Sequence, residues 1–413
     1  MIKASARPQT FFAGLALLLL LALYVVALQV FFTTRFPGAN DFYSRWRGAQ
    51  VFWQEGLNPY SAEATLAIQE GIYGRPALPD EDPGPFAYPF YTVFLLIPLV
   101  PLTYSWASAV WLAVVQAALV GGTLLALRLY RWRQPPWLLA LTLLWTLIFY
   151  HSARTILLGQ FAGVVYFLLI LCLWALQARR EALAGLALAL STVKPQMAFL
   201  LIPALLLWAV FNRRWRFIAW AGGAMAVLLA VSFALQPTWL ADFVGQLARY
   251  PSYTAIGSPV WVVTHYYLPQ LDTPGELALS ALAVGWMLYA WGRGLRPGHG
   301  PADGAFHWAI AVTLVVTNLV ALRTATTNYV MMYPALFLGL KLWATGRGGR
   351  RWVAAFYALS FVAMWTLFLT TVVERFEHPV VYLPLPFGLA VLLILARSGL
   401  ERAAVTPLEP DPR

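Results

Sequence analysis

Long apolar runs separated by short polar segments set the pattern of this chain. The first run, residues 11–32, reads FFAGLALLLLLALYVVALQVFF and is long enough for a helix to span a hydrocarbon core, which needs roughly 20 apolar residues. It is too long for a signal peptide and no small-x-small cleavage site follows it, so we predict an uncleaved transmembrane helix. The whole pattern predicts twelve crossings, near residues 10–32, 104–128, 137–150, 160–177, 182–193, 196–211, 217–235, 276–292, 305–321, 328–344, 352–372 and 380–396.

Composition and charge agree with a membrane protein. Of the 413 residues 61% are hydrophobic and only 11% are charged, whereas soluble domains are about a quarter charged. The net charge of +11 comes from short basic clusters between apolar runs, which is the positive-inside pattern of cytoplasmic loops rather than a nucleic-acid-binding patch. With both termini cytoplasmic, 19 of the 28 Lys and Arg residues lie inside, and seven of the 17 acids lie in the first outer loop.

Residues 86–101, FAYPFYTVFLLIPLVP, do not fit as a thirteenth crossing, because counting them would invert every later loop. Three prolines in about 16 residues predict a re-entrant or broken helix against an outer cavity. The chain is then one all-α integral-membrane domain over residues 1–397. Its long outer loops are residues 33–85, with interfacial helices, and residues 236–275, and a short disordered cytoplasmic tail covers residues 398–413. Cys172, the single cysteine, forms no intrachain disulfide.

The first outer loop carries a lone carboxylate, Asp41, in front of an aromatic stripe at helical spacing. Phe42, Trp46, Ala49 and Trp53 are four, three and four residues apart, which predicts a helix lying on the membrane surface or a binding face. Asp41 has two interpretations: it caps this helix, or it is the base of an active site at the membrane surface.

The other polar residues outside the basic loops also fall at outer helix ends. They are His151, Arg154, Gln160, Lys194, His265 and Arg323. Ionisable groups at a membrane boundary are candidates for function, although the cations can also snorkel to lipid phosphates and a lone histidine can be structural. Several cations near one carboxylate suit a lipid-phosphate substrate, since Arg and Lys hold a phosphate and stabilise it as a leaving group while Asp takes a proton.

Four stretches resemble glycosyltransferase family 87, the polyprenol-phosphate-dependent transferases of the GT-C membrane fold. DFYSRWRGAQVFWQEGLNPY resembles the family's D-x-x-x-Y-x-x-A…G-x-x-P-Y segment through Asp41, Ala49, Gly56, Pro59 and Tyr60. FAYPFYTVFLLIPLVPL resembles its Y-P-P-L…P helix, LLGQFAGVVYFLLI its G-Q-x-N segment, and REALAGLALALSTVKPQMAFLLIPALLL its A-G-L…K-P helix pair, closed by NRRWR. The likeness covers residues 35–216.

The resemblance implies a GT-C fold and an inverting transfer of mannose or arabinofuranose from a polyprenyl-phosphate donor. It implies that Asp41 is the base and Lys194 a phosphate ligand, and it makes the motif residues Gln160, Tyr60 and Tyr88 candidate substrate ligands. Arg154, Arg323, His265 and His151 rest on the predicted topology and on their chemistry.

This sequence departs from the family pattern in two places and lacks an obvious metal site. Phe90 replaces the second proline of Y-P-P, and the G-Q-x-N asparagine is absent after Gln160. Asn40 and Phe42 flank Asp41, so there is no D-x-D pair, and we expect no metal or other cofactor.

The predicted function is a membrane glycosyltransferase that acts on a glycolipid or cell-envelope glycan at the outer face of the bacterial inner membrane. Two alternatives are a lipid-linked sugar transporter or flippase, whose ionisable residues would lie near mid-membrane in repeated halves, and a polysaccharide ligase, which would not need the first-loop Asp. A structural membrane subunit would not explain the convergent cations.

Overall fold

A computed structural model describes residues 6–36, 38, 40–79, 81–253, 257–346, 348–373 and 376–402. The protein is 77% helical, and in these ranges its only β-type pairing is an isolated bridge between Val373 and Phe376. The predicted all-helical class is therefore confirmed. Where the sequence predicts one domain, the contacts divide the chain into two compact units, which we describe separately.

Unit 1 comprises Met1–Phe86, Thr92–Ala117 and Ile156–Gln160. Its helices are α1 (Ala6–Leu28), continued by the π-helical turn η1 (Gln29–Thr33), α2 (Asn40–Glu55), α3 (Ala62–Tyr73), α4 (Thr92–Leu95), the 3₁₀ turn η2 (Ile97–Leu99) and the first part of α5 (Tyr104–Leu129). From Phe12 to Leu28 the side chains of α1 are exposed or half-exposed, as expected of a helix surrounded by lipid.

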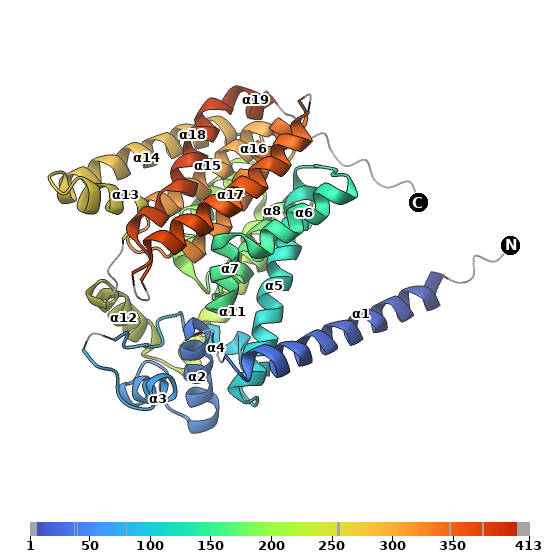
Figure 1. Ribbon diagram of the computed structural model, residues 1–413. Coiled ribbons are helices and arrows are strands. Elements are labelled where there is room, and N and C mark those ends of the chain that lie inside the picture. The colour runs from blue at the N-terminus through green and yellow to red at the C-terminus, as the bar shows by residue number, and fades with distance from the viewer. Residues whose placement is uncertain are drawn as a thin grey trace. The chain divides into compact units, whose positions relative to one another are not determined.

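Unit 2 comprises Ala87–Tyr91, Ala118–Thr155 and Phe161–Arg413. After the end of α5 its helices are α6 (Pro136–Ile148), α7 (Tyr150–Leu157), α8 (Ala162–Gln177), α9 (Glu181–Ser191), η3 (Pro195–Met197), α10 (Leu201–Phe211), α11 (Trp215–Leu235), α12 (Trp239–Tyr253), α13 (Pro259–Trp261), η4 (Val262–Tyr267), α14 (Asp272–Gly294), α15 (Gly304–Val320), η5 (Thr326–Met332), α16 (Tyr333–Ala344), α17 (Gly349–Thr371), η6 (Pro379–Tyr382), α18 (Pro384–Leu395) and α19 (Arg397–Arg402). In Figure 1, α14, α15 and α16 lie side by side, and α15 is buried along almost its whole length at the centre of this unit.

Each segment predicted to cross the membrane contains a helix. Four of these helices, α1 with η1, α5, α11 and α17, are long and apolar enough to span by themselves. The pair α6 and α7 passes the same test together but is bent by 53° at Phe149, where the backbone takes an extended ψ of 143°. Five other apolar helical segments have 10–17 residues, so the count of twelve crossings stays a prediction. The predicted tail, residues 398–413, begins inside helix α19 (Arg397–Arg402), so its first part is helical, and residues 403–413 lie outside the described residues.

Residues 86–101 form no long helix, as the prolines predict. Only the four-residue helix α4 and the three-residue turn η2 interrupt an irregular backbone. Side chains of α2 hold this backbone: Trp46 Nε1 donates to the Leu99 carbonyl at 2.9 Å and Trp53 Nε1 to the Val93 carbonyl at 3.2 Å. Indole donors therefore satisfy carbonyls that no helix satisfies.

The interpretation of the aromatic stripe as a membrane-facing surface is wrong for most of its length. Phe42 and Ala49 are fully buried and Trp46 is 5% exposed, while only Trp53, at 39%, reaches the surface. The spacing correctly predicted a helix with one apolar face. That face packs against protein because the adjacent irregular segment offers both apolar surface and unpaired carbonyls.

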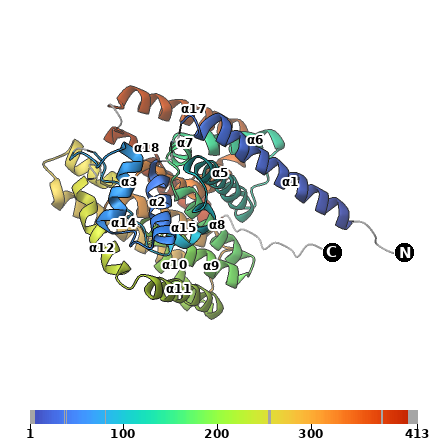
Figure 2. The same cartoon turned by 90° about the horizontal axis from the view of Figure 1, so that it is seen from below.

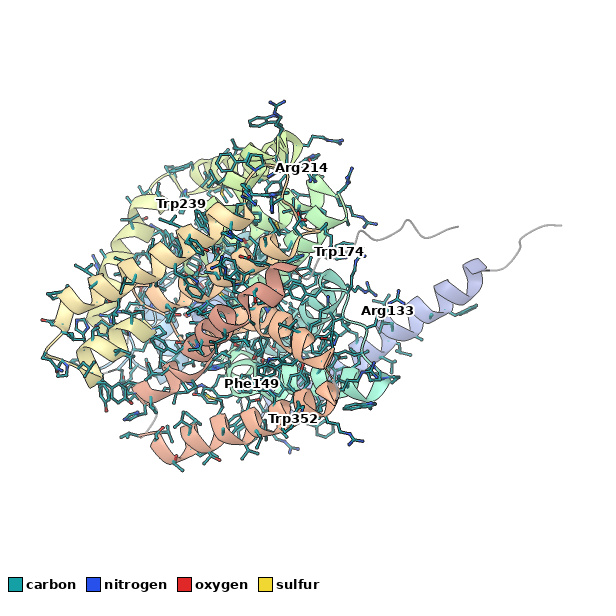
Figure 3. All side chains as sticks on the ribbon, turned by 90° about the horizontal axis from the view of Figure 1, so that it is seen from above. Arg133, Phe149, Trp174, Arg214, Trp239 and Trp352 are labelled. Atoms are coloured by element: carbon teal, nitrogen blue, oxygen red, sulfur yellow. The ribbon has the colours of Figure 1, made fainter. Side chains whose placement is uncertain are left out.

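Helices α5, α8 and α10 end in the same kind of turn. In each turn an arginine has a left-handed φ of 51–56°, and the next residue's N–H reaches back five residues at 2.8 Å, which is the Schellman arrangement; the arginines are Arg131, Arg179 and Arg213. Glycine usually occupies this position. The three arginines belong to the basic clusters that the sequence predicts to be cytoplasmic loops. Figure 3 labels Arg133 and Arg214, which follow two of these turns.

Helices α9 and α11 approach closely at Gly185 (Figure 2). A Cβ added there would lie 2.6 Å from the Ala221 backbone nitrogen and 2.7 Å from the Trp220 Cβ, so the two backbones would have to separate.

We expect Gly185→Ala to destabilise the protein by about 1–3 kcal/mol, the usual cost of overpacking. Thermal unfolding in detergent measures this loss. Gly222→Ala, on α11 where an added Cβ meets nothing within 4 Å, is the matched control and should unfold like the wild type. Equal stability of the two variants would contradict the close approach.

Candidate active site in unit 1

Asp41 is part of the first turn of α2, whose first residue is Asn40. The capping interpretation places Asp41 before the helix, whereas the structure places it inside. Its half-buried carboxylate accepts a hydrogen bond at Oδ2 from Gln160 Nε2, at 2.5 Å. The two residues are 119 positions apart, so tertiary structure rather than local capping decides where this carboxylate lies.

Gln160 is itself held in place by contacts that return to α2. Gly159 has a left-handed φ of 63°, and its carbonyl accepts a hydrogen bond from Trp111 Nε1 at 2.7 Å. The Trp111 ring stacks on Phe42, with ring centroids 5.1 Å apart and planes 10° from parallel. Since Phe42 follows Asp41 in the chain, these contacts form a closed ring that fixes both partners of the carboxylate–amide bond.

A tyrosine close to Asp41 on α2 stays protonated. Burial raises the pKa of Tyr43, and the charge of Arg47 only partly offsets that effect. The Tyr43 ring packs edge-on against Tyr104 with centroids 4.7 Å apart. At neutral pH the phenol is therefore no base.

The two motif tyrosines have packing roles. Tyr60, in unit 1, is 7% exposed and its ring meets Phe86 edge-on at 5.3 Å. Tyr88, in unit 2, is 5% exposed and its ring lies 5.2 Å from that of Phe161. Their burial against phenylalanines accounts for an aromatic residue at both positions without a ligand.

Lys194 lies in unit 2, in the short connection from α9 to η3 that the sequence predicted. Its side chain is 4% exposed. Tyr91 supports the turn by donating its hydroxyl to Thr192, at 2.9 Å to Oγ1 and 3.1 Å to the carbonyl. The side chain is therefore buried in protein rather than extended to the surface, which disfavours snorkelling to lipid phosphates.

Arg154 is held by an acid that the sequence analysis did not single out. Its Nε lies 3.0 Å from Oε1 of Glu377, whose side chain is only 8% exposed. Tyr150 and Thr326 also donate to this carboxylate. An acid between two apolar runs, in a short predicted outer loop, was the available signal for Glu377.

His151 is fully buried among aromatic rings, with those of Phe149, Tyr150 and Tyr329 5.0–5.3 Å away. Neither ring nitrogen has a hydrogen-bond partner among the described residues. His151 therefore belongs to the aromatic core, and the structure does not place it against the carboxylate of Glu377.

His265 and Arg323 share a third cluster. The His265 ring stacks on Trp261 at 5.1 Å, with its Nε2 3.1 Å from Asp272. The Arg323 guanidinium lies over the same indole at 5.6 Å. The Thr264 hydroxyl also lies 3.0 Å from His265 Nδ1. These contacts favour the structural interpretation of His265, because one face of the ring and both nitrogens are already engaged.

Unit 1 thus brings together Asp41 and Gln160, while unit 2 distributes its charged candidates among the turn at Lys194, the Arg154–Glu377 pair and the Arg323–Trp261–His265 stack. Within the described part of the chain no three His, Cys, Asp or Glu residues gather as a metal site would require.

The apolar helices and the fixed carboxylate define an α-helical membrane protein with a candidate active site at the start of α2. The chain belongs to glycosyltransferase family 87, whose family model matches residues 86–317, more than half of its length. The match includes Gln160 and Lys194, but Asp41, Tyr60 and Arg323 lie outside it. Comparisons with curated proteins and with solved structures found no match.

We expect Gln160→Met to lower the rate of glycosyl transfer by about ten- to a hundredfold, the effect of one lost hydrogen bond to a charged group. Steady-state transfer assays measure it. Gln116→Met is the matched control, because Gln116 is a glutamine on α5 that accepts a hydrogen bond from Tyr24 at 2.6 Å. Loss of that hydrogen bond should leave the transfer rate unchanged. Equal rates for both variants would remove Gln160 from the site.

Proposed function

We propose that this membrane glycosyltransferase transfers a sugar of the mannose or arabinofuranose class from a polyprenyl-phosphate donor to a hydroxyl of a glycolipid or cell-envelope glycan. Transfer takes place with inversion, and Asp41 is the general base. The proposed setting is a GT-C-type fold with twelve crossings in the bacterial inner membrane, with both termini cytoplasmic and the active site on the outer face.

The hydrogen bond between Asp41 and Gln160 carries the proposal. Asp41 lies outside the residues that match the family model, but Gln160 lies inside them. This hydrogen bond therefore links the candidate base to a residue of the matched segment. The amide donates to Oδ2, and Oδ1 accepts no hydrogen bond from the residues that the structure describes. A carboxylate held by one oxygen presents the other in a fixed direction.

The chemistry needs a base and a stabilised leaving group. The acceptor hydroxyl oxygen attacks the anomeric carbon while its proton passes to Asp41, and the bond from that carbon to the phosphate oxygen breaks. The electron pair leaves with the polyprenyl phosphate. Attack from the side opposite the leaving group inverts the configuration at the anomeric carbon.

Lys194 is the proposed cation for the leaving phosphate. A buried ammonium stabilises developing negative charge more strongly than an exposed one, because water screens it less. Arg154 is a weaker candidate for this task, since Glu377 already compensates its charge.

We expect Asp41→Asn to lower kcat by about 10²- to 10⁴-fold, the usual contribution of a general base, with donor binding retained. The assay uses purified protein in lipid, a panel of radiolabelled polyprenyl-phosphate sugars and a membrane-lipid acceptor extract. The sugar transferred by the wild type identifies the donor class.

Asp82→Asn is the matched control, because Asp82 is another unit 1 aspartate, whose carboxylate accepts from the Gly84 N–H at 2.9 Å. It should retain full activity. Equal transfer by wild type and Asp41→Asn would remove Asp41 from catalysis. No transfer from any donor, together with measurable movement of lipid-linked sugar across the bilayer, would support the transporter instead.

We expect transfer to continue after treatment with EDTA, because the sequence Asn40-Asp41-Phe42 offers a metal ion a single carboxylate. Rates measured before and after chelation, and after adding back Mg²⁺ or Mn²⁺, test this. Loss of activity on chelation with recovery on metal addition would overturn the metal-free mechanism.

A further inference from the structure

Glu377 is an acid of unit 2 whose side chain is only 8% exposed and has three side-chain partners. Its Oε1 accepts from the Tyr150 hydroxyl at 2.7 Å and pairs with Arg154 Nε at 3.0 Å. Thr326 donates its hydroxyl to the same carboxylate, with Oγ1 2.8 Å from Oε1 and 2.9 Å from Oε2. Two hydroxyl donors and the charge of one guanidinium compensate a carboxylate that is otherwise shielded from water, and losing one of these partners would leave its charge partly unsatisfied.

These bonds connect three separate segments of the chain. Glu377 follows α17, Thr326 begins η5, and Tyr150 and Arg154 both belong to α7. On α7 the two groups that contact Glu377, Tyr150 and Arg154, are four residues apart and so share one face of the helix. The carboxylate therefore contacts both the first residue and the middle of this eight-residue helix.

The direction of helix α7 depends on such side-chain contacts, because α6 does not continue into α7. The chain bends by 53° at Phe149, so the backbone hydrogen bonds of α6 do not fix the direction of α7. Other side chains help: Thr155 donates to the Thr327 carbonyl at 3.0 Å, and the Ser152 and Tyr333 hydroxyls are hydrogen-bonded. Those bonds are neutral, whereas the bonds to Glu377 are charge-assisted and about twice as strong.

The residues just after α7 belong to the candidate active site. Leu157 ends the helix, and Gly159 and Gln160 follow after Leu158, with the Gly159 N–H bonded to the Ile156 carbonyl at 2.9 Å. A short turn of the chain thus joins helix α7, which Glu377 contacts, to Gln160, whose amide donates to Asp41.

We propose that Glu377 is a positioning residue for the Asp41 site: it fixes helix α7, and with it the Gln160 amide. The proposal rests on the proposed function only for its kinetic consequence. Its structural consequence, order in residues 156–160, can be measured without any substrate.

The experiment compares Glu377→Gln with Glu401→Gln in the full-length protein in lipid nanodiscs. Glu401 is the matched control, since it is another acid of unit 2 that two arginines hold, Arg293 at 2.9 Å and Arg397 at 3.1 Å, with a side chain 15% exposed. Hydrogen–deuterium exchange of peptides covering residues 156–160 is the first readout. The kcat and donor KM are the second.

We expect Glu377→Gln to speed exchange in residues 156–160, to lower kcat about tenfold as one weakened charge-assisted bond would, and to change the donor KM less than about twofold. Glu377→Asp, which keeps the charge, should recover part of kcat. Glu401→Gln should match the wild type in both readouts.

Wild-type exchange and wild-type kcat in Glu377→Gln would overturn the proposal. Should that variant fail to fold, Tyr150→Phe and Thr326→Val each remove one donor without changing the charge, and unchanged exchange in both would equally overturn it. An inactive wild type would count against the proposed function alone, because the exchange readout would still decide the role of Glu377.

Discussion

The hydrogen bond from the Gln160 amide to the Asp41 carboxylate joins two segments 119 residues apart. The contacts of Trp111 restrict how those two segments move. Trp111 binds the Gly159 carbonyl and stacks on Phe42, so the neighbours of both partners are fixed by one indole. A general base must be held within a narrow range of positions to accept a proton efficiently, and in unit 1 aromatic packing and one amide hold the candidate base, Asp41.

Much of this arrangement could be predicted from the sequence. The spacing of apolar runs located the helices because a spanning or buried helix needs such runs whatever it packs against. Asp41, Gln160 and Lys194 are candidates from the sequence because polar residues at predicted outer helix ends are few. The prolines of residues 86–101 predicted an irregular segment, since prolines lack a backbone donor and clash with a continuing helix.

What could not be predicted depends on which surfaces meet. The stripe on α2 has the same spacing whether it faces lipid or protein, so only tertiary structure reveals that Phe42 and Trp46 are buried. The Arg154–Glu377 pair spans 223 positions, and no local pattern links an arginine on α7 to an acid after α17. The bend at Phe149 was hidden in a continuous apolar run. It turns α7 into a separate element that depends on side-chain bonds for its direction.

The central claim, that Asp41 and Gln160 act as one catalytic unit, is tested most directly by a double-mutant cycle on transfer rate. Wild type, Asp41→Asn, Gln160→Met and the double variant would be compared under single-turnover conditions. If the amide acts only by holding the base, Gln160→Met slows the wild type but causes no further loss in the Asp41→Asn background. The same fractional loss in both backgrounds would show that Gln160 acts independently of Asp41 and would contradict the account.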